Sequence, residues 1–157
     1  MFETIIWATD GSDTADRALP YAKALAEGPG HRLIAVHCKE TYSGRGGGWP
    51  VLADEDEIQD KIRRQVAEAD DESLDVSLRI ITAAAPGAPH KIADLARELD
   101  ADAIVVGTRG HSPAAGVLLG SLTQRLLHIA QCPVVAVPPS DRVEGERADP
   151  ATATAAH

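Results

Sequence analysis

At 157 residues, 44% of them hydrophobic, the sequence is long enough for one domain with a water-excluding core and too short for two ordinary ones. Its formal net charge of −9 and its 3% of aromatic residues argue against an extended nucleic acid as ligand, because a polyanion is repelled and stacking platforms are few. Its apolar runs, such as residues 103–106, are far shorter than the roughly 20 residues that cross a bilayer, so no membrane span is expected.

Short apolar runs alternate with amphipathic windows along the chain, a pattern typical of βα units that build a parallel sheet. The first strand is predicted over Thr4–Thr9. A helix follows it, capped by Ser12 or Asp13 and ended by the glycines and proline from Gly28 onward. The second strand is predicted over Leu33–Cys38.

The middle of the chain is less regular. Residues 41–50 carry four glycines and are predicted to form a flexible surface loop, with a lid over a ligand as the alternative. A surface helix with a thin apolar stripe is expected from about residue 54 to residue 69. The third strand, Val76–Thr82, mixes Ser77 and Arg79 with apolar neighbours, as an edge strand would.

The last third of the domain contains two more predicted helices, each followed by a predicted strand. One helix is predicted behind Pro89 and another over residues 118–129, and strands are predicted over Ala103–Gly107 and Val134–Pro138. The first, fourth and fifth strands are nearly continuous apolar runs, so each is expected to be buried on both faces.

Residues 1–139 are predicted to form the domain, and residues 140–157, which lack periodicity, a disordered tail. Cys38 and Cys132 belong to no CxxC pair or zinc-type cluster and are expected to be packing thiols in a reducing compartment. His37 is expected to be a core or site-wall residue. Because the N-terminus also lacks a secretory pattern, we expect a cytoplasmic protein.

Residues typical of phosphate binding follow the fourth strand, as Gly107-Thr108-Arg109-Gly110 and, nine residues later, Gly120-Ser121. Glycines let backbone N–H groups approach a phosphate, and the helix that follows adds unpaired amides and the positive end of its dipole. The segment lacks the lysine of a Walker A loop and is not GxGxxG. Arg109 is the nearest cation, and Ser121 and Thr123 offer hydroxyl groups.

For three residues, a role in the protein's own structure or at its surface is an alternative to ligand binding. Asp10, at the end of the first strand, either caps the turn that follows or contacts a ligand, and both roles are compatible. Ser121 with Gln124 matches the capping box S-x-x-Q, so its hydroxyl serves either the helix or a phosphate. Arg109 is either a phosphate ligand or a solvated loop residue.

The spacing G-x2-G-x9-G-S is complete in this chain, at Gly107, Gly110, Gly120 and Ser121. It resembles the ATP-binding pattern of the universal stress protein family. The likeness also covers IIWATDGSDTADRAL at residues 5–19, VHC at 36–38, GxP at 87–89 and CPVVAVP at 132–138. Only the tail past about Pro139 falls outside it.

The resemblance implies an α/β fold: a single-domain, Rossmann-like open sheet of five parallel strands in the order 3-2-1-4-5, with helices on both faces. Strands one and four then meet at a topological switch point, where open α/β sheets bind ligands. It implies ATP there, with Asp10 also holding an accompanying Mg²⁺ or Mn²⁺ ion. The expected nucleotide-binding residues are Ala8, Thr9, Asp10, Cys38, Gly107, Arg109, Gly110, Gly120, Ser121, Leu122 and Thr123.

The function implied by the resemblance is that of an ATP-binding regulatory protein of the stress response, acting on protein partners that the sequence does not identify. A homodimer is expected through the edge of the fifth strand, because an exposed edge leaves unpaired backbone groups. Two alternatives stay open: a slow ATP hydrolase that uses Asp10 with a metal ion, and a nucleotide-free dimeric scaffold.

Overall fold

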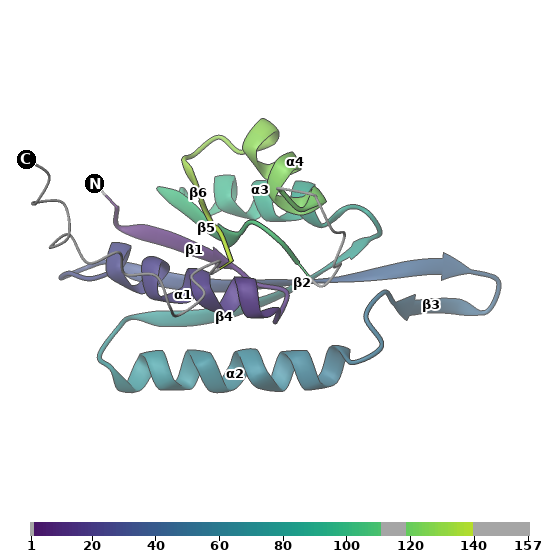
Figure 1. Cartoon of the computed structure of the whole chain (residues 1–157), viewed down its shortest axis with the longest axis horizontal. Helices are drawn as coiled ribbons and strands as arrows, with labels where there is room; N and C mark the ends of the chain where they lie inside the picture. Colours follow the sequence, from purple (N-terminus) through teal and green to yellow (C-terminus); the bar gives the residue numbers. More distant parts are fainter. Residues whose placement is uncertain (1, 111–118, 140–157) are drawn as a thin grey trace, which may run out of the picture.

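The computed structural model describes residues 2–110 and 119–139 of the chain. Its helices and strands, in chain order, are β1 (Thr4–Ala8), α1 (Asp13–Leu25), β2 (Arg32–Gly44), β3 (Gly47–Pro50), α2 (Glu55–Asp71), β4 (Val76–Ala84), α3 (Ala88–Glu98), β5 (Ala103–Gly107), α4 (Ser121–Ile129) and β6 (Val134–Val137). Figure 1 shows the sheet in the middle, with α1 and α2 on one face and α3 and α4 on the other.

Within the described part of the chain, the sheet has six strands rather than the expected five, because β3 adds an antiparallel strand beside β2. The five predicted strands are parallel and pair in the order β4-β2-β1-β5-β6, as the expected order 3-2-1-4-5 requires. β1 and β5 therefore lie side by side, and the helices that follow them, α1 and α4, lie on opposite faces. This arrangement creates the expected switch point at the carboxyl ends of β1 and β5.

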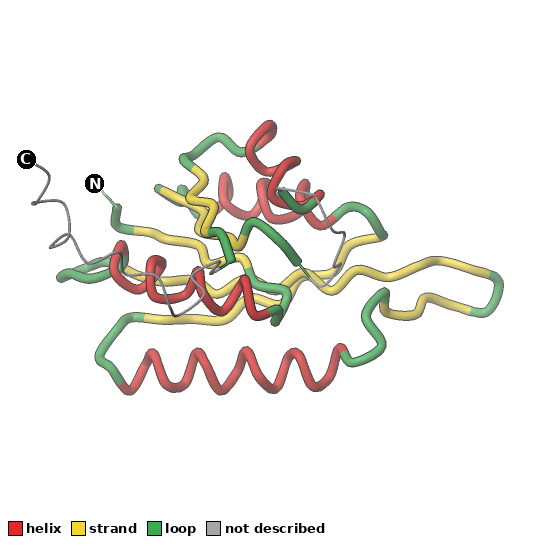
Figure 2. Tube along the Cα trace, in the orientation of Figure 1, coloured by secondary structure: helices red, strands yellow, loops and turns green. Residues whose placement is uncertain are grey.

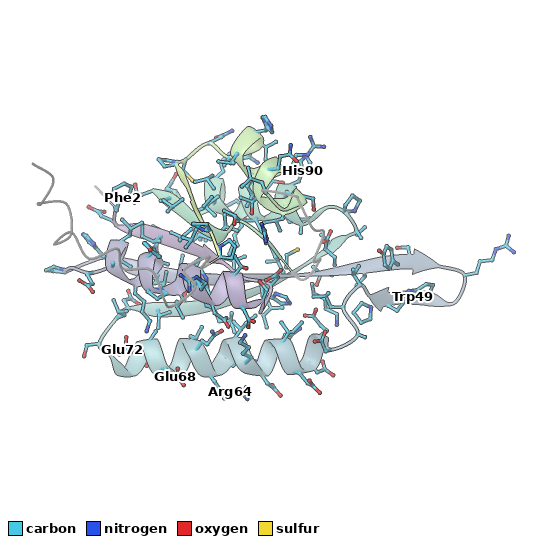
Figure 3. The ribbon with its side chains drawn as sticks, in the orientation of Figure 1. Phe2, Trp49, Arg64, Glu68, Glu72 and His90 are labelled. Atoms are coloured by element: carbon cyan, nitrogen blue, oxygen red, sulfur yellow. The ribbon has the colours of Figure 1, made fainter. Side chains whose placement is uncertain are left out.

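The flexible loop predicted over residues 41–50 is wrong, because these residues form a β-hairpin. β2 runs on to Gly44 and pairs antiparallel with β3, with Tyr42 opposite Trp49. Gly46 and Gly47, at φ +124° and +119°, provide the backbone angles of the turn. The hairpin projects beyond the rest of the sheet in Figure 2, and Figure 3 places Trp49 near its end.

Apolar side chains cover both faces of the central strands. β1 and β5 are buried along their whole length, as predicted. β6, predicted to be equally buried, is only half-buried over Val134–Ala136, because it lies at the sheet edge. The edge position predicted for the third strand is confirmed: β4 pairs with β2 alone among the described strands.

The helices begin and end close to their predicted limits. Ser12 caps α1, its Oγ accepting a hydrogen bond from the Ala15 amide at 3.2 Å. α2 turns Ile58 and Ile62 toward the sheet and charged residues such as Glu68 toward solvent (Figure 3). α4 begins at Ser121, later than predicted.

Two predicted features lie outside the described residues: the segment 111–118 within the glycine motif, and the disordered tail over 140–157. Within the described ranges, none of the helices combines the length and the hydrophobicity that spanning a membrane would take.

Candidate functional site

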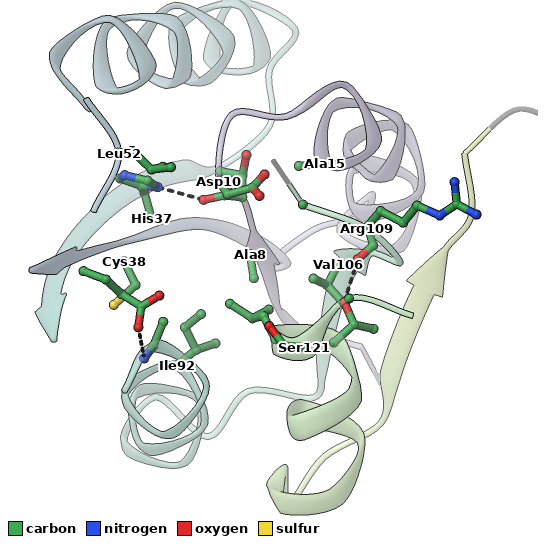
Figure 4. A pocket seen from close by; sticks show the side chains of 18 of the residues that line it. Ala8, Asp10, Ala15, His37, Cys38, Leu52, Ile92, Val106, Arg109 and Ser121 are labelled. Carbon is green, nitrogen blue, oxygen red and sulfur yellow. Dashed lines mark hydrogen bonds between the residues drawn. The ribbon is translucent and has the colours of Figure 1, made fainter. Parts of the chain in front are cut away.

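A cavity of about 510 Å³ opens at the carboxyl ends of β1 and β5 and beside the middle of β2 (Figure 4). It lies at the switch point, and its volume falls in the range of about 300–1,000 Å³ that is typical of small-molecule sites. All eleven residues predicted to bind the nucleotide line it: Ala8, Thr9, Asp10, Cys38, Gly107, Arg109, Gly110, Gly120, Ser121, Leu122 and Thr123.

One end of the cavity is formed by the N-terminus of α4. Gly120 is the N-cap, with φ −65° and ψ 157°, and the first intrahelical bond runs from the Gln124 amide to the Gly120 carbonyl at 3.0 Å. The amides of the first turn, at Ser121, Leu122 and Thr123, therefore have no carbonyl partner within the helix. They border the cavity together with the positive end of the helix dipole, so this end suits an anion.

The two hydroxyl groups at this end differ in what they can offer a ligand. Thr123 is buried, and its Oγ1 donates to the Gly107 carbonyl at 2.7 Å, so Thr123 presents its backbone amide to the cavity rather than its hydroxyl hydrogen. The capping box considered for Ser121 is wrong, because Gly120 holds the cap and Ser121 is the first helical residue. Its side chain lines the cavity.

The first two glycines of the motif lie close to other groups, which are backbone atoms at Gly107 and a side-chain carboxylate at Gly110. A Cβ added at Gly107 would lie 2.8 Å from the backbone carbon and oxygen of Thr14, because α1 packs directly on the end of β5. A Cβ at Gly110 would lie 2.5 Å from Oδ2 of Asp10. Gly110 thus makes room for a carboxylate that comes from the neighbouring strand.

Asp10 shapes the turn between β1 and α1 while also facing the cavity. Its Oδ1 accepts a hydrogen bond from the Ser12 amide at 3.0 Å, which confirms the turn-capping role. Among the described residues there is no group of three or more His, Cys, Asp or Glu side chains placed to hold a metal ion. An ion at Asp10 would therefore take its other ligand atoms from water or from a bound ligand.

Arg109 lines the cavity, but its guanidinium group is exposed and extends away from it in Figure 4. This conformation of Arg109 matches the alternative that it is a solvated loop residue.

The sequence did not predict the residues at the opposite end of the cavity. Three segments form this end: the part of β2 after Cys38, the residues that follow the hairpin, and the start of α3. The additional lining residues at this end are Glu40, Val51, Leu52, Ala88 and Ile92. The GxP at residues 87–89 was the one available signal, since it marks the start of α3.

A buried hydrogen-bonded pair supports the wall between the two ends. His37 donates from Nδ1 to the Thr9 carbonyl at 2.9 Å, because a carbonyl only accepts, and its Nε2 lies 2.7 Å from Oε1 of Glu55. Glu55 is 3% exposed and also accepts from Gln59 at 2.8 Å. The site-wall role predicted for His37 is confirmed. Nothing in the sequence singled out Glu55, because acidic residues are common in the first turn of a helix.

Cys38 is a weakly acidic thiol at the wall of the cavity. Burial, with a smaller contribution from the charge of Glu40, raises the pKa of the Cys38 thiol to about 12. The thiolate is the reactive form. In a Cys132→Ala variant, alkylation by iodoacetamide at pH 8 should therefore be about 100-fold slower than that of free cysteine. The rate should rise about tenfold per pH unit up to pH 10; a plateau near pH 8.5 would contradict the assignment.

The fold and the cavity define a doubly wound α/β protein with a ligand site at its switch point and a helix N-terminus at one end of that site. The chain matches the model of the Universal stress protein family over residues 1–138. It is 33% identical over 149 residues to a universal stress protein of Thermus aquaticus, covering 87% of this chain and 99% of the relative. The chain belongs to the universal stress protein family.

Solved structures of the family share its fold. A universal stress protein from Archaeoglobus fulgidus matches with a TM-score of 0.67 at 26% identity, over 87% of this chain and 98% of that one. Another, solved in complex with cAMP, matches with a TM-score of 0.61 at 28% identity, over 86% and 95% of the two chains.

Proposed function

We propose that this protein binds ATP in the cavity and acts as a nucleotide-dependent regulator of a cytoplasmic stress response rather than as a dedicated catalyst. The observation that carries the proposal is the position of the α4 N-terminus, whose first-turn amides border the cavity at the switch point beside the glycines of the motif. The cAMP complex of a relative 28% identical in sequence supports an adenine nucleotide as the ligand.

In this proposal the nucleotide lies along the cavity. The phosphates lie at the amides of Ser121–Thr123, and the base lies at the far end, between the end of β2 and α3. Asp10 would hold a Mg²⁺ or Mn²⁺ ion together with the phosphates. Such an ion neutralises phosphate charge, which suits a carboxylate placed beside them.

A regulatory role is favoured over catalysis by the side chains available at the phosphate end. Asp10 is the one carboxylate there among the described lining residues, and one of its oxygens already accepts the Ser12 amide. Hydrolysis needs a group that orients or deprotonates the attacking water. Nucleotide occupancy would instead bias the conformation of a surface that partners read.

The proposed regulator is a homodimer formed through β6. This strand pairs with β5 on one side, and residues Val134–Ala136 are half-buried. Pairing with β6 of a second copy would satisfy the backbone groups of the other edge.

The proposal is tested by isolating the protein under native conditions, releasing bound small molecules by denaturation and identifying them. The native sample should sediment as a dimer, release ATP and leave added ATP intact over hours. Steady turnover that Asp10→Ala abolishes would favour the hydrolase instead. An empty cavity, with no thermal shift on adding ATP, would favour the nucleotide-free scaffold.

A further inference from the structure

A carboxylate is held at the far end of the cavity, away from α4. Glu40 lies on β2 two residues past Cys38, and its Oε2 accepts a hydrogen bond from the Ala88 amide at the start of α3, at 3.3 Å. Its own carbonyl accepts from the Val51 amide at 2.9 Å. Main chain and side chain together fix Glu40 between α3 and the segment that leaves the hairpin.

The surroundings of this carboxylate suit a flat heterocycle. Val51, Leu52 and Ile92 supply apolar walls, and Glu40 is the acidic group among them. The anion-binding amides of α4 occupy the other end, so a nucleotide that places its phosphates there brings its base to Glu40.

The local electrostatics favour hydrogen-bond donors. Besides burial, the charges of Glu40 and Glu55 raise the pKa of the neighbouring Cys38 thiol, while Lys91 acts in the opposite direction. The Glu40 side chain lies at the N-terminus of α3, where the positive end of the helix dipole interacts favourably with a carboxylate. A ligand that points an N–H group at Glu40 is therefore stabilised here, and a ligand that points a carbonyl oxygen or a C–H group at it is not.

We propose that Glu40 is a specificity-determining residue that accepts a hydrogen bond from the exocyclic amino group of the base, so that the cavity selects 6-aminopurines. A carboxylate has about four lone-pair sites, and the Ala88 amide uses one of them. The inference rests on the proposed nucleotide binding and adds a residue that reads the base.

The test compares ATP with purine riboside triphosphate, which is ATP without the 6-amino group, by calorimetric titration of the full chain. The wild type should bind ATP at least about tenfold more tightly, as expected for a hydrogen bond to a charged group. Glu40→Ala should bring the ratio to about one. Glu40→Gln, which keeps an acceptor for the Ala88 amide, should leave about threefold, because a neutral hydrogen bond is roughly half as strong.

Glu57→Gln is the matched control, since it removes the same charge from an exposed position in the first turn of α2 and should keep the wild-type ratio. If Glu40→Ala does not fold, Glu40→Gln alone decides the outcome. A wild type that binds both triphosphates equally, or a ratio unchanged in Glu40→Gln, overturns the inference and leaves the proposed function standing. If neither triphosphate binds, both fall.

A third ligand, 2′-deoxy-ATP, separates the base from the ribose. The preference for ATP over 2′-deoxy-ATP should be the same in the wild type and in Glu40→Gln. A preference that Glu40→Gln removes would assign Glu40 to the ribose 2′-hydroxyl and overturn its assignment to the base.

Discussion

Replacing Gly110 with alanine should weaken ATP binding by about tenfold or more. The added Cβ would lie 2.5 Å from Oδ2 of Asp10, so the carboxylate must shift from the position in which its Oδ1 accepts from the Ser12 amide. Overpacking of this kind costs about 1–3 kcal/mol, and here it distorts the loop beside the phosphates. Calorimetric titration of ATP measures the change.

The matched control is Gly48→Ala on the hairpin. A Cβ there would meet its nearest neighbour, the Tyr42 carbonyl oxygen, at an ordinary 3.5 Å, so ATP affinity should be unchanged. Undiminished ATP affinity in Gly110→Ala would show that the phosphates do not lie at this glycine loop.

Among variants at Glu55 and Glu57, Glu55→Ala should lose the most stability. Glu55→Ala should lower the free energy of unfolding by about 2–4 kcal/mol, because Nε2 of the buried His37 loses its partner and cannot reach water. The expected signature in urea is a lower midpoint with an unchanged m value.

Two further variants show what the pair contributes. Glu57→Ala removes an exposed acid from the same helical turn and should change stability by no more than about 0.5 kcal/mol. Glu55→Gln should keep more of the stability than Glu55→Ala, since the side-chain amide can still form a hydrogen bond with Nε2 of His37. A Glu55→Ala variant as stable as Glu57→Ala would show that the pair does not stabilise the fold.

Much of this protein could be read from local patterns. Apolar periodicity alone located the five parallel strands and the helices between them, because burial on one face or both imposes a spacing that is visible in a short window. The glycine motif located one end of the cavity, since a close backbone approach needs glycine wherever it occurs. The strand order came from the family resemblance rather than from periodicity.

The structure also corrected details that local patterns left ambiguous. Residues 41–50 contain enough glycine to resemble a loop, yet pairing of Tyr42 with Trp49 makes them a hairpin. The pattern S-x-x-Q suggested a cap at Ser121, whereas the cap is Gly120. Both errors arose because glycines and a capping pattern are compatible with more than one backbone conformation, and the hydrogen bonds that the chain forms decide between them.

The sequence by itself determined the α/β class, the five parallel strands and the glycine-lined end of the cavity, because each depends on residues close together in the chain. Only the tertiary structure decided that Glu55 contacts His37, that Ala88 contacts Glu40 and that Gly110 lies beside Asp10. The residues of these three pairs are 18, 48 and 100 positions apart. Such pairs depend on how helices pack on the sheet, and no local spacing encodes that.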